Sequence, residues 1–277
     1  MSKGVCRQIF LLGFGACVFL ASGAANASVS DLKAQWSEAA NPNGNWSYRQ
    51  GTSPLGHVST WQSTNGWSYG QPAWANGTQS PAPYIPAWVR AAGTVDAGAP
   101  AIDWQIGDIV VHSQDGDNGN GQGPGNVLWT TPTRQTVQVS GSVWLTRHLG
   151  RSVQWQLYKG AAVLTQGNLF DGDGFSRASP MALSSGSGGA AALQNIILNA
   201  GESLELRFNT TSTFGEIVGV NLTFNATPVP VPASRPVTLL LMATSLLTAG
   251  AFSRRFLREH TPGNGSERRS REPRHSR

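Results

Sequence analysis

Residues 28–227 consist of short β-favouring runs that are interrupted, about every 8–15 residues, by Gly, Pro or Asn. The clearest run is Ser152 to Lys159, in which Val153, Trp155 and Leu157 alternate with polar neighbours. A period of two residues is typical of a strand with one buried and one solvated face. Similar runs are expected at 108–112, 126–130, 135–139, 142–146, 193–198, 203–208 and 217–224. The series predicts an all-β fold, an antiparallel β-sandwich or jelly roll.

Tryptophan is concentrated in the N-terminal part of this domain, between residues 36 and 100. Six of the ten tryptophans lie there: Trp36, Trp46, Trp61, Trp67, Trp74 and Trp88. The sequence Asn-Gly-Asn-Trp-Ser-Tyr at 43–48 is echoed by Asn-Gly-Trp-Ser-Tyr at 65–69. Few aliphatic residues accompany these rings. We therefore expect few strands here, and order that comes from aromatic packing onto the sandwich.

The N-terminus has the three parts of a secretory signal. Residues 1–8 are positively charged, residues 9–20 are almost wholly apolar, and Ala25-Asn26-Ala27 has the small residues of a cleavage site. The apolar run is shorter than the roughly 20 residues that a membrane-spanning helix needs. We therefore predict an exported protein with a signal peptide over residues 1–27, cut after Ala27.

The C-terminus also has three parts. Residues 228–236 are punctuated by proline and are interpreted as a linker, because proline fits neither a helix interior nor a central strand. Residues 237–253 are apolar apart from small hydroxyl residues, which predicts a transmembrane helix. Arg254 and Arg255 follow at once, so this end is expected on the cytoplasmic side, with a basic, disordered tail over 254–277.

This order of a short proline motif, an apolar segment and an arginine cluster resembles the PEP-CTERM sorting signal. The residues that carry the resemblance are Pro230, Pro232, Ala233, Arg254 and Arg255. Val231 stands where the family usually has Glu. The resemblance implies recognition by an exosortase, cleavage near the proline motif while the chain crosses the inner membrane, and a final location at that membrane, the cell surface or the extracellular space.

The domain between the two ends resembles an ectodomain that recurs in exported bacterial proteins with such tails. The resemblance is carried by residues 41–48, 127–132 and 218–222. It implies a jelly roll of the galactose-binding or carbohydrate-binding kind.

Charge and cysteine content limit what this domain can bind. The whole chain has a net charge of +5, but residues 28–229 carry 9 basic and 12 acidic side chains. A nucleic-acid-binding face needs clustered Lys and Arg, so nucleic acid is not expected as a partner. Cys6 and Cys17 are the two cysteines of the chain, and both lie in the predicted signal peptide. The processed domain is therefore expected to have no disulfide and no thiolate metal ligand.

No local motif indicates an enzyme. The sequence has no nucleophile elbow, zinc-protease helix motif or phosphate-binding loop. His57, His112 and His148 lack metal-binding spacing, and we expect polar or packing roles for them. Asp108 and Glu216 remain an alternative as a glycosidase pair, which needs carboxyl groups roughly 5–9 Å apart.

Two loops rich in Asp, Asn and Gly offer hard oxygen ligands. Asp115 and Asp117 lie in the first loop, and Asp171 and Asp173 lie in the second. Such ligands suit Ca²⁺. The first loop does not match an EF-hand, because Asn126 stands where the bidentate acid would be. Solvated turns are the alternative interpretation, and no cofactor is expected beyond a single structural calcium ion.

Sugars are bound by exposed aromatic platforms with polar side chains around them. Trp46 and Tyr48, like their counterparts Trp67 and Tyr69, lie in polar Asn-Gly turns. We predict that these four residues bind ligand, with Trp46 and Trp67 exposed. Their polar neighbours are Asn43, Asn45, Asn65 and Gln71. The alternative is that the rings pack in the core.

The favoured interpretation is a non-catalytic envelope or matrix protein whose β-sandwich associates with exopolysaccharide. Two alternatives stay open. One is a purely structural or adhesive surface protein without a sugar site, and the other is a glycoside hydrolase with dispersed carboxylates.

Overall fold

The computed structural model describes residues 27–61, 70–76, 85–93, 102–115 and 123–229. All of these belong to one compact unit of the chain, which ends at Val229. Over these ranges the chain forms strands and two short 3₁₀-helices, without an α-helix. No helix in this part of the chain is long and apolar enough to cross a membrane.

Several predictions about the two ends fall outside these ranges. Ala27 is the first described residue, so Ala25 lies beyond them. The same is true of the predicted transmembrane helix at 237–253 and of the sorting residues Pro230, Pro232, Ala233, Arg254 and Arg255.

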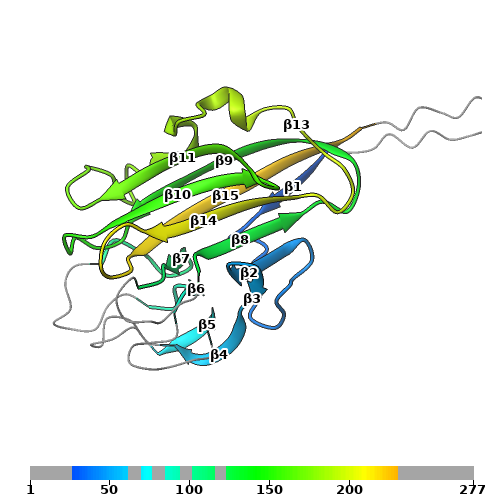
Figure 1. Ribbon diagram of the computed structural model, residues 1–277. Coiled ribbons are helices and arrows are strands. Elements are labelled where there is room, and N and C mark those ends of the chain that lie inside the picture. The colour runs from blue at the N-terminus through cyan, green and yellow to red at the C-terminus, as the bar shows by residue number, and fades with distance from the viewer. Residues whose placement is uncertain (1–26, 62–69, 77–84, 94–101, 116–122, 230–277) are drawn as a thin grey trace, which may run out of the picture. The chain divides into compact units, whose positions relative to one another are not determined.

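In the described ranges, fifteen strands form two sheets in which every pairing is antiparallel (Figure 1). In chain order they are β1 (Ser28–Asp31), β2 (Trp46–Gln50), β3 (Ser53–Pro54), β4 (Gly56–Trp61), β5 (Gln71–Ala75), β6 (Ala87–Arg90), β7 (Ile109–His112), β8 (Gly125–Thr130), β9 (Gln135–Leu145), β10 (Ser152–Lys159), β11 (Ala162–Phe170), β12 (Met181–Ala182), β13 (Ile196–Leu198), β14 (Ser203–Thr210) and β15 (Ile217–Pro228). The 3₁₀-helices η2 (Leu183–Ser185) and η3 (Ala190–Leu193) lie between β12 and β13.

The sheets differ in size and in the order of their strands. The nine-stranded sheet runs β12-β9-β15-β7-β6-β5-β4, with β1 also paired to β15 and β13 to β9. The six-stranded sheet runs β11-β10-β14-β8-β2-β3.

Large aromatic side chains join the two sheets. Phe224 of β15 lies against Trp46 of β2 and Trp129 of β8, with ring centroids 5.3 and 4.9 Å apart. Trp88 of β6 meets Phe208 of β14 at 5.9 Å. All five side chains are at most 1% exposed. The sheets therefore share a hydrophobic core that lies between them.

The predicted alternation is present in the strands at the middle of the six-stranded sheet. In β10, Val153, Trp155 and Leu157 are buried, and the residues between them are partly exposed. In β14, Leu204, Leu206 and Phe208 are buried and Arg207 is partly exposed, but Glu205 is buried too, where it accepts hydrogen bonds from Asn126 and Arg207. The prediction of an all-β, antiparallel fold is confirmed.

Two of the predicted runs form one strand. β9 continues through Gly141, which the sequence pattern places between two separate runs. A side chain at Gly141 would collide with the backbone carbonyl of Asn221 on β15. The glycine therefore permits a close approach of two strands rather than a turn. β11 was not predicted, and its pairing with β10 along the whole strand holds it extended despite its Ala, Gly and Asn residues.

The Trp-rich part contains more strand than its composition predicts. β4, β5 and β6 extend the nine-stranded sheet, and β2 and β3 belong to the six-stranded sheet. Trp74 and Trp88 lie directly opposite each other on β5 and β6. Aromatic side chains fit a pleated, half-buried surface as well as β-branched ones do. A segment poor in aliphatic residues can therefore still form strands.

The outer edge of β11 is covered by the segment that contains the 3₁₀-helices. The amide of Ser187 donates a hydrogen bond to the carbonyl of Gln166 at 2.9 Å, and the amide of Gly188 donates one to the hydroxyl of Thr165 at 3.2 Å. Gly188 also approaches the carbonyl of Leu164 so closely that a side chain would not fit. The middle of this edge is therefore closed to further strand pairing.

We expect Gly219→Ala to destabilise the domain by about 1–3 kcal/mol, because the new methyl group would overlap the indole of Trp144 on the adjacent strand. Gly56→Ala in β4 is the matched control, since the nearest atom to its methyl group would be 4.0 Å away. Urea denaturation of the full-length protein measures both. Equal losses in the two variants would contradict the packing of Trp144.

Candidate ligand-binding pocket

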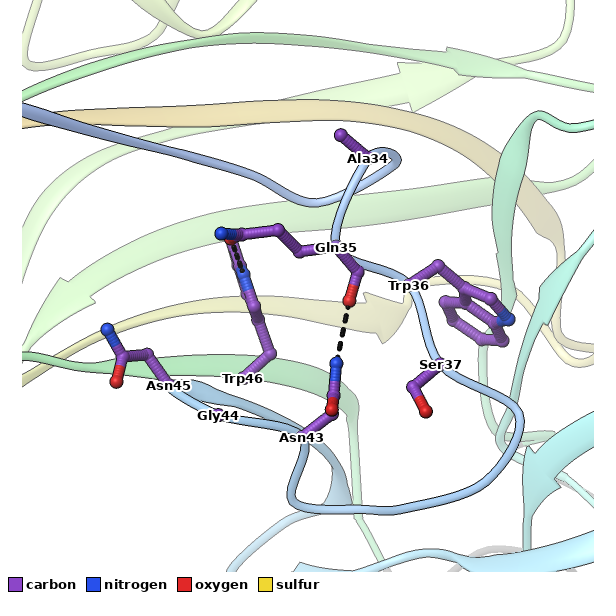
Figure 2. A pocket seen from close by; sticks show the side chains of 8 residues that line it. All are labelled: Ala34, Gln35, Trp36, Ser37, Asn43, Gly44, Asn45 and Trp46. Atoms are coloured by element: carbon purple, nitrogen blue, oxygen red, sulfur yellow. Dashed lines mark hydrogen bonds between the residues drawn. The ribbon is translucent and has the colours of Figure 1, made fainter.

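Two loops beside β2 line a pocket of about 480 Å³. The volume lies within the range of small-molecule sites. Figure 2 shows the residues that line it: Ala34, Gln35, Trp36, Ser37, Asn43, Gly44, Asn45 and Trp46.

Local hydrogen bonds shape both loops. After β1, the backbone carbonyl of Asp31 accepts the amide of Gln35 at 2.9 Å, which makes a tight turn. In the second loop, Asn43 and Trp46 exchange backbone hydrogen bonds at 2.9 and 3.0 Å. Gly44 in this turn has a φ of 55°, a conformation that residues with side chains rarely adopt.

Gln35 joins the two loops. Its side-chain oxygen accepts the indole N–H of Trp46 at 2.7 Å, and its backbone carbonyl accepts the side-chain amide of Asn43 at 2.9 Å (Figure 2). Trp46 is itself fixed by its stacking on Phe224 in the core. The polar wall of the pocket is therefore anchored to the contact between the sheets.

The pocket offers neutral hydrogen-bonding groups. Its eight lining residues include no charged side chain. Asn45 is partly exposed, and the bonds above leave Nε2 of Gln35 and Oδ1 of Asn43 for other partners. An amide carries both a donor and an acceptor. This is the combination that binds the adjacent hydroxyl groups of a sugar.

The prediction that Trp46 is exposed is wrong, and Tyr48, which was predicted with it to bind ligand, is buried as well. These side chains are 1% and 0% exposed. Tyr48 lies between Trp36 and Trp88, with ring centroids 4.5 and 5.8 Å away. Both side chains point inward from β2, and their rings pack against other aromatic rings in the core between the sheets.

Asp171 and Asp173 are engaged within their own loop. Asp171 accepts hydrogen bonds from the ring of His148 and from the amide of Gly150, both at 2.8 Å. The side chain of Asp173 accepts two amides of its loop, at 3.0 and 2.8 Å. These contacts make a turn that is held by its own hydrogen bonds, and the assignment of Asp171 and Asp173 to calcium stays a prediction.

Asp115 is buried and accepts the amide of Gly215 at 2.5 Å. Over the ranges that the structure describes, no three His, Cys, Asp or Glu side chains gather in a way that could hold a metal ion. Asp117, Trp67 and Tyr69 lie outside those ranges, so the roles assigned to them stay predictions.

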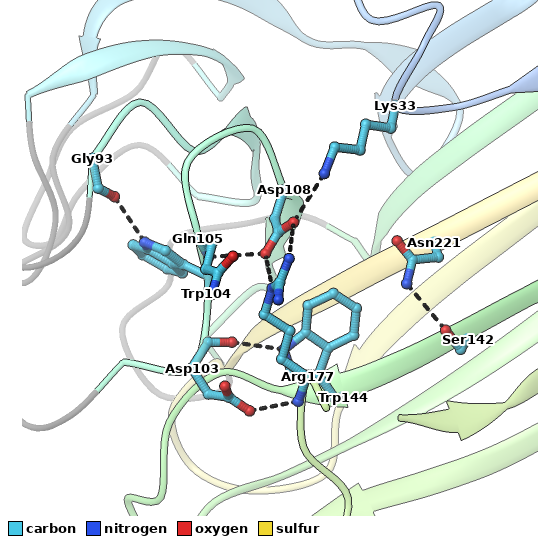
Figure 3. Close-up of polar contacts among 10 residues, drawn as sticks. All are labelled: Lys33, Gly93, Asp103, Trp104, Gln105, Asp108, Ser142, Trp144, Arg177 and Asn221. Carbon is cyan, nitrogen blue, oxygen red and sulfur yellow. Dashed lines mark hydrogen bonds and ion pairs between the residues drawn. The ribbon is translucent and has the colours of Figure 1, made fainter. Parts of the chain in front are cut away.

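Asp108 lies at the centre of a polar network (Figure 3). Its carboxylate accepts Nε and Nη2 of Arg177 at 2.5 and 3.2 Å, Nζ of Lys33 at 3.1 Å and the amide of Gln105 at 2.9 Å. Burial opposes ionisation of Asp108, but these hydrogen bonds hold its pKa below its usual range. The backbone amide of Arg177 also binds the carboxylate of Asp103 at 2.5 Å. The network ties together three segments that are distant in the sequence.

Glu216 belongs to a second cluster, where β9, β15 and β7 end beside one another. It is fully buried, and one of its carboxyl oxygens accepts the amide of Ile217 at 2.8 Å. Burial raises the pKa of Glu216 to about 7, although Arg147 and Arg151 favour its charged form. Burial also lowers the pKa of His112 in the same cluster. The cluster is thus a set of ionisable groups enclosed in the fold.

The two carboxylates of the alternative glycosidase pair lie at opposite ends of β7. Asp108 directly precedes β7. Glu216 precedes Ile217, which pairs with His112, the last residue of β7, so Glu216 lies beside the other end of this strand. Neither of them lines the pocket.

Sequence reasoning missed the roles of Gln35 and Arg177. Gln35 is one polar residue in a polar loop, and Arg177 is 69 positions from Asp108. No local pattern marks such partners, because each contact exists only once the sheets are formed.

No protein-family model matches the chain, and no curated protein matches it.

The buried Glu216 makes stability depend on pH. Its proton is lost near pH 7 in the folded protein and near pH 4.5, the ordinary Glu pKa, in the unfolded chain. Between these values the folded state binds more protons, so this contribution to stability falls as pH rises. Glu216→Gln does not titrate. Its free energy of unfolding relative to wild type should therefore increase from pH 4.5 to pH 8, by about 1–3 kcal/mol.

Urea denaturation at both pH values measures this difference, and the opposite effect of His112 cancels because both proteins retain it. Glu202→Gln is the control. Glu202 accepts the amide of Asn199, and this hydrogen bond lowers its pKa, so its substitution should not produce the same trend. A Glu216→Gln effect of equal size at both pH values would contradict the burial of an ionisable carboxyl group here.

Proposed function

We propose that this protein is an exported, non-catalytic component of the cell envelope or extracellular matrix that associates with exopolysaccharide through its β-domain. We assign the two facing sheets to a β-sandwich of the jelly-roll type. The pocket formed by residues 34–37 and 43–46 carries the proposal, because its size and neutral amide lining suit a sugar.

The charged residues support binding rather than hydrolysis. Asp108 is engaged by Arg177 and Lys33, and Glu216 is enclosed in the fold. A glycosidase needs two carboxyl groups that face one substrate from a short separation. The positions of these two residues, at opposite ends of β7 and away from the pocket, favour a domain that holds a glycan without cleaving it.

The burial of the tryptophans favours a second candidate, a structural or adhesive surface protein without a sugar site. Each of the nine tryptophans in the described ranges is at most 9% exposed. Sugar recognition would then depend on amides rather than on aromatic platforms, which makes the pocket the point at which the two candidates differ.

Export and sorting form part of the same proposal. The signal is cleaved after Ala27, and the sorting motif at 230–233 is recognised by an exosortase-type enzyme at the inner membrane. The supporting observation is the sequence order of proline motif, apolar segment and the arginines at 254 and 255.

Asn45→Ala should weaken the binding of a neutral sugar by about three- to tenfold, because one or two uncharged hydrogen bonds are lost. An array of neutral mono- and disaccharides identifies the sugar, and calorimetry with the full-length protein measures the affinity. Asn225→Ala, an exposed amide on β15, is the control. If no neutral sugar binds, the structural candidate gains support. If Asn45→Ala binds a sugar like wild type, the pocket is not the site of that binding.

The sorting proposal predicts the mass of the cell-associated form. Removal of the signal and cleavage near the proline motif should give a chain that begins at Ser28 and ends close to Pro232. Mass spectrometry of the intact protein from an envelope fraction measures both ends. A cell-associated chain that still ends at Arg277 would contradict exosortase processing.

A further inference from the structure

The outer face of the six-stranded sheet carries two rows of amide side chains. The cross-strand register places Asn168, Gln154 and Asn209 opposite one another on β11, β10 and β14. Gln166 and Gln156 form the adjacent row on β11 and β10. The residues that alternate with the glutamines along β10 are buried in the core. The amides therefore point away from it.

Hydrogen bonds hold the second row in place. Nε2 of Gln156 donates to Oε1 of Gln166 at 2.7 Å. Oε1 of Gln156 accepts the hydroxyl of Tyr158 at 3.0 Å and Nδ2 of Asn209 at 3.2 Å. The oxygen of Gln156 is thus used within the protein. The hydrogen bond to Gln156 fixes the side chain of Asn209 and leaves Oδ1 of Asn209, beside Gln154, to accept a hydrogen bond from a ligand.

Arg207 and Glu205 compensate each other on this face, and Arg49, in the same row on β2, is hydrogen-bonded to the carbonyl of Thr52. Arg207 donates to the carboxylate of Glu205 at 3.0 and 2.7 Å, and Asn126 donates to the same carboxylate group at 2.7 Å. The guanidinium of Arg207 lies 4.0 Å from the ring centroid of Tyr158 and covers one side of that ring.

This chemistry selects the kind of partner that the face can bind. Nucleic acid or an anionic polymer requires clustered, unpaired Lys and Arg, and the core of a protein interface is enriched in exposed aromatic residues. On this face neutral amides predominate, and the exposed ring of Phe170 lies two residues from Asn168 on β11. Such a face complements a partner that is uncharged and rich in hydroxyl groups, because an aromatic ring can cover the apolar C–H groups of a sugar.

The spacing of the strands sets the length of that partner. Neighbouring strands lie about 4.8 Å apart, so the three amides of the first row extend over roughly 10 Å. A chain that crosses the strands meets a new amide at each one. A single sugar unit reaches only part of the row.

We propose that the row formed by Asn168, Gln154 and Asn209 binds an extended, uncharged polysaccharide chain laid across β11, β10 and β14. The ligand class depends on the proposed function, but the surface is distinct from the pocket beside β2.

The test uses the full-length protein and calorimetry with neutral oligosaccharides of glucose, galactose and mannose, from one to six units long. Wild type should bind the hexasaccharide of at least one series at least about tenfold more tightly than its monosaccharide. Gln154→Ala/Asn209→Ala should lose this gain and keep the thermal melting of wild type, because both side chains are partly exposed. Gln138→Ala/Asn225→Ala removes two exposed amides that face each other across β9 and β15, and should bind like wild type.

Three results would overturn the proposal: no gain with chain length, a gain that survives in Gln154→Ala/Asn209→Ala, or tighter binding of the anionic polysaccharide alginate than of any neutral chain. Asn45→Ala separates the two sites. Loss of monosaccharide binding in Asn45→Ala without any gain with chain length would leave the pocket standing and remove the sheet face. A gain that only the sheet variant loses, with Asn45→Ala unchanged, would support the sheet face and remove the pocket.

Discussion

Phe224 lies between Trp46 and Trp129, and through these contacts one strand of the nine-stranded sheet meets two strands of the six-stranded sheet. Rings of this size bury 150–250 Å² each and prefer offset or tilted arrangements, so they set both the distance and the orientation of the layers they join. The described domain contains no cysteine that could assist. Its cohesion therefore depends on packing, and the pocket inherits its shape from the same contact, because the indole of Trp46 also holds Gln35.

The sequence is a good guide to this fold where one side of a strand faces the core. β10 follows the period of two residues because burial alone decides which of its side chains face inward. The sequence is a poor guide where a neighbouring strand decides the outcome. Gly141 resembles a break, but it serves the close approach of β15, and β11 is held extended by β10 rather than by its own residues. The Trp-rich part contains more strand than its few aliphatic residues predict, because aromatic residues also fit a pleated surface.

The candidate site shows the same division. Asn43 and Asn45 are visible in the sequence as polar neighbours of Trp46, and both line the pocket. The sequence does not show that the ring of Trp46 faces the core, because this orientation depends on contact with Phe224, 178 positions away in the chain. The two carboxylates differ in a comparable way. Hydrogen bonds from Arg177 and Lys33 help to lower the pKa of Asp108. At Glu216 the effect of burial is larger than that of the neighbouring arginines, so its pKa is raised. Residue type alone does not separate these two environments.

The hydrogen bond from the amide of Ser187 to the carbonyl of Gln166 occupies part of the edge of the six-stranded sheet. A sheet with an open edge can recruit a strand from a neighbouring molecule, and repetition of that step produces fibrils. At β11 the chain fills this position with its own backbone. Copies of the domain at high concentration are therefore not drawn into fibril growth through this part of the edge. Under the proposed function, the arrangement of these copies would follow the polysaccharide chain to which they bind rather than pairing between their strands.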